Sequence, residues 1–278
     1  MERLIQTNGV TLATESFGDP ANPAILLIMG GGASMDWWED EFCERLATAG
    51  RFVIRYDHRD TGQSTTYEPG APGYSANDLV ADAVGLLDAY GLATAHIVGM
   101  SMGGRIALKL ALDHPGRVAS LALISTSPGE GDDLPSMTPE LQAAFSGEMA
   151  EPDWSDRASV IDYLVADARR FAAASRPFEE DAMRDLVSRA YDRTTNMASA
   201  MNHFTAADSG HPREQLAKVS APTLVLHGTE DPLFPYEHGR ALAKEIPGAR
   251  LVALERTGHE IPKVAWDVAI PEILRHTG

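Results

Sequence analysis

The sequence predicts one α/β domain with a mostly parallel, eight-stranded sheet that is interrupted by a helical insertion. Apolar runs of strand length alternate with helical patterns from residue 24 onward, stop after residue 127 and resume at residue 223. Such alternation is typical of a parallel sheet with helices on both faces. We therefore assign residues 1–127 and 214–278 to an α/β core, and residues 128–213 to a helical cap inserted after the sixth strand.

An antiparallel hairpin is predicted at the N-terminus, with strands at residues 3–7 and 10–17. The turn between them is Asn8-Gly9, a pair that readily adopts the positive φ angles of a type I′ turn. The six further strands are predicted at residues 24–29, 52–56, 96–100, 118–124, 223–227 and 250–254. The first of these is continuously apolar, which indicates a strand covered on both faces.

Helices are predicted between the strands and throughout the cap. The core helices are expected at residues 36–47, 78–90, 236–246 and 262–276, and one further core helix is expected to begin just after residue 101 and to end at residue 112. The cap shows no convincing strand, and its helices are expected at residues 139–149, 156–174, 179–191 and 194–207. A connection of this length inside a sheet usually covers or serves a site.

Composition excludes several classes of function. The chain has 278 residues and a formal net charge of −17, which opposes binding to nucleic acid or to an anionic membrane. The first nine residues lack a signal-peptide pattern, and the apolar run at residues 24–29 is too short to span a bilayer. We expect a cytoplasmic protein. The single cysteine, Cys43, precludes an intrachain disulfide and is expected to be a small buried side chain.

A glycine-bracketed serine occurs in the sequence Gly99-Met100-Ser101-Met102-Gly103. The Gly-x-Ser-x-Gly pattern marks a sharp strand-to-helix turn that exposes the serine hydroxyl. The pentapeptide alone is weak support, but here it lies between a predicted strand and a predicted helix. We therefore interpret Ser101 as a nucleophile.

A serine nucleophile needs a histidine base and a carboxylate that orients it, and in this type of fold they follow the serine in the order acid, then histidine. Asp231 follows the predicted strand at residues 223–227 and is our candidate acid. Glu230 is a local alternative, and Asp132 with Asp133 is a second one.

His259 follows the predicted strand at residues 250–254 and is our candidate base. His238 falls within a predicted helix and His276 lies at the C-terminus, where we expect fraying, so neither suits this role. The order along the chain removes four earlier residues, Asp57, His58, Asp60 and His96. Residues 55–64 are expected to pack beneath the site, with Asp57 and Arg59 in a local charge network.

Acyl transfer also needs N–H donors for the developing oxyanion. The N–H after the nucleophile belongs to Met102, and the second is expected from Gly31, with Gly32 as the alternative. A nucleotide-binding loop at these glycines is disfavoured, because no Lys-Ser or Lys-Thr follows and Gly-x-Gly-x-x-Gly is absent. No metal-binding motif is present, so we expect neither a metal nor a cofactor.

Six motifs together resemble a known family: Phe17-Gly18-Asp19-Pro20, Met29-Gly30-Gly31, the run from Tyr56 to Thr65, the serine pentapeptide, Asp231-Pro232 and Gly258-His259. The chain resembles the α/β-hydrolase family, and within it the aclacinomycin (anthracycline) methylesterase group. The resemblance implies a serine hydrolase that cleaves a carboxylic ester through an acyl-enzyme. A serine at residue 101, rather than an aspartate, argues against dehalogenase or epoxide hydrolase chemistry.

The substrate is expected to be a small-molecule ester or lactone that is bulky and apolar, with a polyketide-like methyl ester as one candidate. One face of the predicted helix at residues 194–207 carries Met197, Met201 and Phe204. One face of the predicted helix at residues 179–191 carries Met183, Leu186 and Tyr191. The residues expected to line the substrate site are Met29, Gly32, Met100, Met197, Met201 and Phe204. Lactone, perhydrolase, haloperoxidase-like and C–C bond hydrolase activities stay open, as does a small-molecule receptor. The protein is expected to be a monomer or a homodimer.

Overall fold

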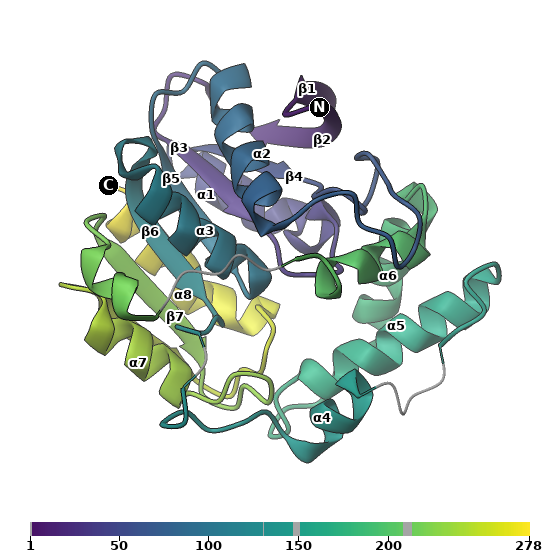
Figure 1. Ribbon diagram of the computed structural model, residues 1–278. Helices are drawn as coiled ribbons and strands as arrows, with labels where there is room; N and C mark the ends of the chain where they lie inside the picture. The colour runs from purple at the N-terminus through teal and green to yellow at the C-terminus, as the bar shows by residue number, and fades with distance from the viewer. Residues whose placement is uncertain (1, 130, 147–150, 208–212) are drawn as a thin grey trace.

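The computed structural model describes residues 2–129, 131–146, 151–207 and 213–278. Its centre is an eight-stranded sheet with the order β1-β2-β4-β3-β5-β6-β7-β8 (Figure 1). The strands are β1 (Arg3–Thr7), β2 (Val10–Phe17), β3 (Ala24–Ile28), β4 (Phe52–Tyr56), β5 (Ala95–Met100), β6 (Val118–Ile124), β7 (Thr223–Gly228) and β8 (Arg250–Leu254). β2 pairs antiparallel with β1 and β4, and every other pairing is parallel. The predicted fold class is confirmed.

Helices cover both faces of the sheet because alternate residues of its central strands are buried on opposite sides. In β3, Leu26 and Ile28 pack in one apolar cluster with α2 (Ala76–Ala89), α3 (Met102–Asp113) and α7 (Glu237–Glu245). Ile25 and Leu27 pack in the other cluster with α1 (Asp40–Thr48) and α8 (Lys263–His276). The continuous apolar run therefore serves two cores.

The single helix expected at residues 36–47 is wrong. The structure has a 3₁₀ turn η1 (Met35–Trp37), a break, and then α1. At the break, the carbonyl oxygen of Trp38 accepts a hydrogen bond from the Arg55 guanidinium, and the buried Trp38 ring lies 5.4 Å from the Phe42 ring. Tertiary packing of Trp38 thus outweighs the helical pattern.

The elements described between β6 and β7 are helices, and we call those at residues 139–204 the cap (Figure 1). They are α4 (Pro139–Phe145), α5 (Arg157–Phe171), α6 (Glu180–Arg193) and the 3₁₀ helix η3 (Met197–Phe204). Two further 3₁₀ helices, η2 (Pro115–Arg117) and η4 (Arg213–Lys218), precede β6 and β7, respectively. Residues 147–149 of the helix expected at 139–149, and residues 130, 147–150 and 208–212 of the expected cap, lie outside the described residues.

The last cap element is a 3₁₀ helix and not the α-helix expected at residues 194–207. Residues three apart lie on one side of a 3₁₀ helix. Ser199 Oγ accordingly donates to the Tyr67 carbonyl at 2.7 Å, and Asn202 Nδ2 donates to the Glu68 carbonyl at 3.0 Å. Anchoring to the core explains the tighter winding of this segment.

Two further expectations concern single features of the chain. Cys43 is fully buried, and burial raises the pKa of its thiol to about 12, which confirms the expectation of a small buried side chain. Among the described helices, none combines the length and apolar character that crossing a bilayer requires.

Candidate active site

The turn between β5 and α3 holds Ser101 in an unusual backbone conformation, with φ of 53° and ψ of −120°. The two glycines of the motif make this turn possible. A Cβ atom on Gly99 would lie 2.3 Å from the Gly103 carbonyl oxygen, and one on Gly103 would lie 2.2 Å from the Ile28 carbonyl oxygen. Only glycine therefore lets α3 start this close to β3 and β5.

Ser101, His259 and Asp231 form a chain of hydrogen bonds. Ser101 Oγ lies 2.8 Å from His259 Nε2, and His259 Nδ1 lies 2.9 Å from Asp231 Oδ2. In a neutral imidazole, Nδ1–H donates to the carboxylate and Nε2 accepts from the serine hydroxyl. The loops after β5, β7 and β8 bring the three side chains together at the carboxyl edge of the sheet.

The loop after β7 fixes the Asp231 carboxylate. Its Oδ1 accepts the backbone N–H groups of Leu233 and Phe234, each at 2.9 Å. Burial alone would raise the pKa of Asp231, but the neighbouring His259 and His227 and the hydrogen bond from the Phe234 N–H outweigh it, so the pKa lies below its ordinary value. A carboxylate that stays ionised can orient an imidazole and stabilise its protonated form.

The alternative acids lie elsewhere. Glu230 accepts hydrogen bonds from the backbone and the hydroxyl of Ser175, a cap residue. Asp133 is exposed and forms an ion pair with Arg213 at 2.6 Å. Asp132 is also exposed. None of the three bonds to His259 in the described part of the chain.

The two alternative histidines, His238 and His276, have structural contacts. His238 lies in α7 and is 3.0 Å from Ser127 Oγ. His276 ends α8, and its Nε2 lies 3.1 Å from the carbonyl oxygens of Leu121 and Pro222. The expectation of a frayed C-terminus at His276 is wrong, because these contacts tie the helix end to the sheet.

Residues Gly30-Gly31-Gly32 follow β3 and form a glycine loop that lies beside Ser101. A Cβ atom on Gly30 would be 3.2 Å from the Ser101 Cβ. The N–H of Gly32 donates to His203 Nδ1 at 2.9 Å, so it is already used. Within the described residues, the N–H groups of Gly31 and Met102 have no hydrogen-bond partner. This arrangement leaves Gly31 and Met102, and not the alternative Gly32, as candidate oxyanion donors.

A cavity of about 520 Å³ lies between the core and the cap and opens onto Ser101 and His259. Its wall includes all six residues expected at the substrate site: Met29, Gly32, Met100, Met197, Met201 and Phe204. Met183 and Leu186 line it too. Tyr191, expected on the same face, does not; its ring packs against the Arg157 guanidinium at 5.9 Å.

Several residues at the site escape the sequence patterns. Phe145 and Phe171 line the cavity, with ring centroids 6.4 Å apart, and Phe145 lies 6.1 Å from Phe204. The carbonyl oxygen of Phe171 also accepts the backbone N–H of His259 at 2.7 Å. The apolar character of the cap predicted a cavity wall, but nothing in its sequence signals a backbone bond to the candidate base.

Among residues 2–129, 131–146, 151–207 and 213–278, no cluster of three or more His, Cys, Asp or Glu side chains is arranged to hold an ion. The site is built from a serine, an imidazole and a carboxylate.

Residues 23–264 match the family model described as alpha/beta hydrolase fold. The chain belongs to this family. Two curated relatives of this α/β-hydrolase are named rhodomycin D methylesterase: DauP from Streptomyces sp. (strain C5) and DnrP from Streptomyces peucetius. Each is 34% identical to it over 99% of this chain and 97% of the relative. The predicted resemblance to the methylesterase group is therefore confirmed.

A solved structure shares the fold of this α/β-hydrolase. The esterase EaEST from Exiguobacterium antarcticum aligns with a TM-score of 0.80 over 100% of this chain and 99% of its own. At 23% sequence identity, this likeness shows the fold alone.

Proposed function

We propose that this α/β-hydrolase cleaves a carboxylic ester with Ser101 as the nucleophile, His259 as the base and Asp231 as the acid that orients it. The observation that carries the proposal is the hydrogen-bonded chain of these three residues, of which Ser101 and His259 line an apolar cavity. The methylesterase relatives confirm the prediction of an ester hydrolase at the level of enzyme class. The residue roles and the identity of the ester are our proposal.

In the proposed reaction, Ser101 Oγ attacks the ester carbonyl carbon while His259 Nε2 takes the hydroxyl proton. The carbonyl oxygen becomes an oxyanion, which accepts hydrogen bonds from the Gly31 and Met102 N–H groups. His259 then gives its proton to the departing alcohol, leaving an acyl group on Ser101. Water, deprotonated by the same imidazole, releases the acid and restores the serine.

We propose a methyl ester of a bulky, apolar, polycyclic acid as the substrate. A cavity of about 520 Å³ is large enough for a drug-sized molecule. Its aromatic edges, provided by Phe145, Phe171 and Phe204, suit the faces of fused rings. The two relatives named for rhodomycin D support the same class.

A panel of methyl esters tests the substrate. The acids would increase from one ring to four fused rings, and methanol release would give kcat/KM for each. We expect kcat/KM to rise with ring number, because each ring buries further apolar surface. A maximum at the smallest acyl group would contradict the proposal, and Ser101→Ala serves as the control without turnover.

The panel also separates the alternatives. A lactone of equal size and a substrate of a C–C bond hydrolase would be assayed beside the esters, and faster turnover of either would favour that activity. Tight binding of a four-ring ester without any turnover would favour a receptor. A perhydrolase would turn over an ester faster when peroxide replaces water as the acyl acceptor.

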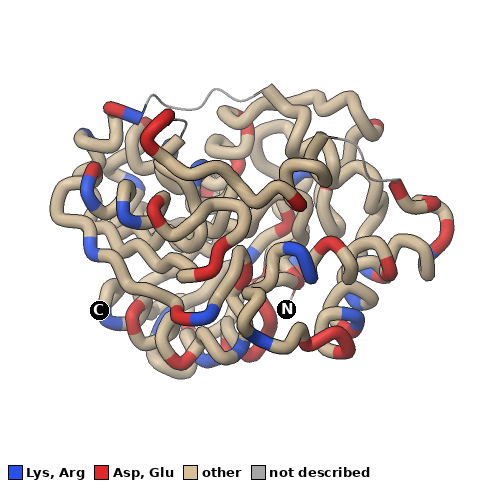
Figure 2. Tube along the Cα trace, turned by 90° about the horizontal axis from the view of Figure 1, so that it is seen from below, with Lys and Arg blue, Asp and Glu red and all other residues tan. Residues whose placement is uncertain are grey.

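Charge supports a small-molecule partner and disfavours polyanionic ones. The formal net charge is −17, and Figure 2 shows acidic positions scattered along the trace with basic positions among them. Such a surface repels nucleic acid and anionic lipid at long range. The cytoplasmic location and the choice between monomer and homodimer stay predictions.

A further inference from the structure

One histidine of the cap bonds directly to the glycine loop beside Ser101. His203 lies in η3, and its Nδ1 accepts the backbone N–H of Gly32 at 2.9 Å. Its other ring nitrogen, Nε2, lies 2.7 Å from the carbonyl oxygen of Arg59 in the core. His203 therefore bridges two core loops from the cap.

These two contacts determine the protonation of His203. A carbonyl oxygen only accepts hydrogen bonds, so Nε2 must carry a proton to bond to Arg59. An N–H only donates, so Nδ1 must carry a lone pair to accept from Gly32. Burial, together with the neighbouring His58, lowers the pKa of His203 to about 4, which keeps the ring neutral. A neutral ring in this one tautomer satisfies both loops.

The other end of the glycine loop is held by a second histidine. His58 Nε2 lies 3.0 Å from the carbonyl oxygen of Met29, and the His58 and His203 rings are 5.6 Å apart. The Met29 carbonyl belongs to the peptide plane between residues 29 and 30, and the Gly32 N–H belongs to the plane between residues 31 and 32. Only the plane between them, which carries the Gly31 N–H, lacks a partner among the described residues.

Three consecutive glycines would otherwise leave this loop with wide conformational freedom. Fixing the flanking planes restricts the middle one, because neighbouring planes share only two dihedral angles at each Cα. The Phe204 ring restricts it further, since a Cβ atom on Gly31 would lie 3.2 Å from that ring. His203 and Phe204 thus seat η3 directly on the loop.

We propose that His203 is a positioning residue for the oxyanion hole: by accepting the Gly32 N–H from the cap, it orients the peptide that presents the Gly31 N–H to the reacting carbonyl oxygen. The inference rests on the proposed ester hydrolysis at Ser101. It makes the cap part of the catalytic machinery as well as a wall of the substrate cavity, because the Gly31 N–H is no longer held in its orientation when η3 loses its contacts with the glycine loop.

Three substitutions of His203 separate its two hydrogen bonds. His203→Leu removes both bonds at similar volume. His203→Asn places an amide oxygen near the Nδ1 position and retains the acceptor for Gly32, whereas His203→Gln extends an amide toward Arg59 and loses that acceptor. The matched control is Ser199→Ala, which removes another bond from η3 to the core, the one to Tyr67, without touching the glycine loop.

The expected result is a loss in kcat with little change in substrate affinity. Removing one oxyanion donor typically costs about 10²–10³-fold in kcat, so a misoriented donor should cost about 10- to 100-fold. We expect this loss in His203→Leu and His203→Gln, recovery to within about fivefold of wild type in His203→Asn, and no loss in Ser199→Ala. KM should change by less than about threefold in all four.

Affinity for phenylboronic acid gives a second readout that a merely structural role would not move. The boron atom bonds to the serine oxygen and places a tetrahedral oxygen where the oxyanion develops. Its Kd should rise in parallel with the loss in kcat, while the Kd of a substrate ester, measured in the Ser101→Ala background, stays the same.

Equal kcat and equal boronate affinity in wild type, His203→Leu and His203→Gln would overturn the inference. So would an His203→Asn variant as impaired as His203→Leu, or an equal loss in Ser199→Ala. If His203→Leu does not fold, the comparison of His203→Asn with His203→Gln decides. Turnover by Ser101→Ala would instead refute the proposed function, so the two failures are distinguishable.

Discussion

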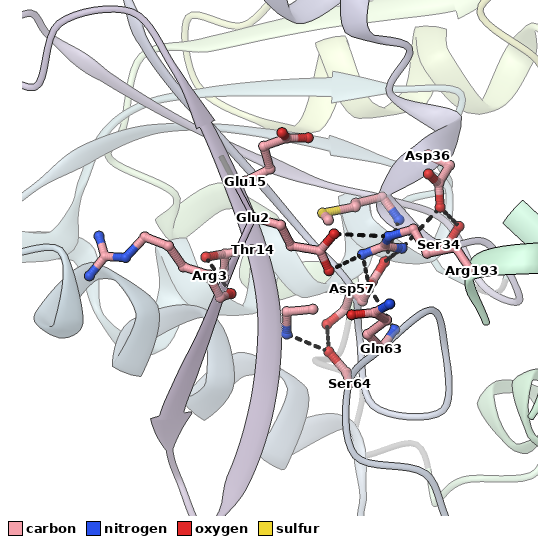
Figure 3. Close-up of polar contacts among 12 residues, drawn as sticks. Glu2, Arg3, Thr14, Glu15, Ser34, Asp36, Asp57, Gln63, Ser64 and Arg193 are labelled. Atoms are coloured by element: carbon pink, nitrogen blue, oxygen red, sulfur yellow. Dashed lines mark hydrogen bonds and ion pairs between the residues drawn. The ribbon is translucent and has the colours of Figure 1, made fainter. Parts of the chain in front are cut away.

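Arg193 and Asp57 form an ion pair across the boundary between the cap and the core, with Arg193 Nη2 2.5 Å from Asp57 Oδ2 (Figure 3). Arg193 ends α6, and Asp57 follows β4 and is fully buried. The guanidinium also lies 3.0 Å from the carboxylates of Asp36 and Glu2. Burial raises the pKa of Asp57, and Arg193 partly offsets this effect. One cap residue, Arg193, therefore neutralises the charge of a carboxylate buried in the core.

Removing this arginine should destabilise the protein strongly. Arg193→Met leaves Asp57 buried without its ion-pair partner, a change that typically costs about 3–5 kcal/mol. Unfolding in urea, followed by circular dichroism, measures the loss. The control is Arg157→Met, which breaks an exposed pair within the cap, with Asp192 at 2.7 Å, and should cost less than about 1 kcal/mol. Equal losses in the two variants would contradict the buried role of Arg193.

Acid should destabilise the protein through buried histidines, among them His58 and His203. Burial lowers the pKa of His58 to about 4, and burial together with His58 does the same for His203. In the unfolded chain, both histidines bind protons below the ordinary histidine pKa of 6.5. In the folded protein, they stay neutral until the pH falls to about 4. Each histidine therefore contributes roughly 3 kcal/mol of stability, which is fully present above about pH 6.5 and is lost as the pH falls toward 4.

Denaturant unfolding at about pH 7 and about pH 4.5 checks this expectation. His203→Asn removes one of these buried histidines, so its free energy of unfolding should fall less between the two pH values than that of the wild type. The exposed His114 offers a control, because His114→Asn should leave the fall unchanged. A fall that is identical in wild type and His203→Asn would refute the buried neutral state of His203.

The glycine at the start of α3 should not tolerate a side chain. In Gly103→Ala, the new Cβ meets the Ile28 carbonyl oxygen at 2.2 Å, a backbone atom that cannot rotate away. We expect a loss of about 1–3 kcal/mol or more, measured by thermal unfolding. At Gly116 a Cβ would have nothing within 4 Å, so Gly116→Ala should change stability by less than about 0.5 kcal/mol. Similar melting temperatures for both variants would show that the close approach is absent.

The acid can be tested against its neighbour in the chain. Asp231→Asn should lower kcat by about 10⁴-fold, because an amide cannot hold His259 in the tautomer that the serine needs. Glu230→Gln should change kcat by less than about threefold, since Glu230 bonds to Ser175 and not to the imidazole. Ester hydrolysis by the two purified variants gives the comparison, and the opposite ranking would make Glu230 the acid.

The sheet and the order of the candidate residues were predictable because local patterns determine them. β4, β6 and β8 begin and end at the predicted residues, since each is a short apolar run bounded by turn-forming or polar residues. Ser101 stands out through the two glycines that its turn requires. Asp231 and His259 follow from their places after β7 and β8.

The contacts of the cap were not predictable, because they join segments far apart in the chain. Asp57 and Arg59 were expected in one charge network, but Asp57 pairs with Arg193, and Arg59 pairs with Asp82 at 2.7 Å. Asp57 and Arg193 are 136 residues apart in the sequence, and no local pattern signals such a bond. The bond from His203 to Gly32 spans 171 residues and escaped prediction for the same reason.

Covalent labelling of Ser101 tests the central claim most directly. The protein would be treated with a fluorophosphonate, digested, and the modified peptide sequenced by mass spectrometry while ester hydrolysis is followed. We predict one adduct, on Ser101, that forms as activity is lost, and neither adduct nor turnover in Ser101→Ala. An adduct on another residue with full loss of activity, or ester turnover retained by Ser101→Ala, would contradict the account.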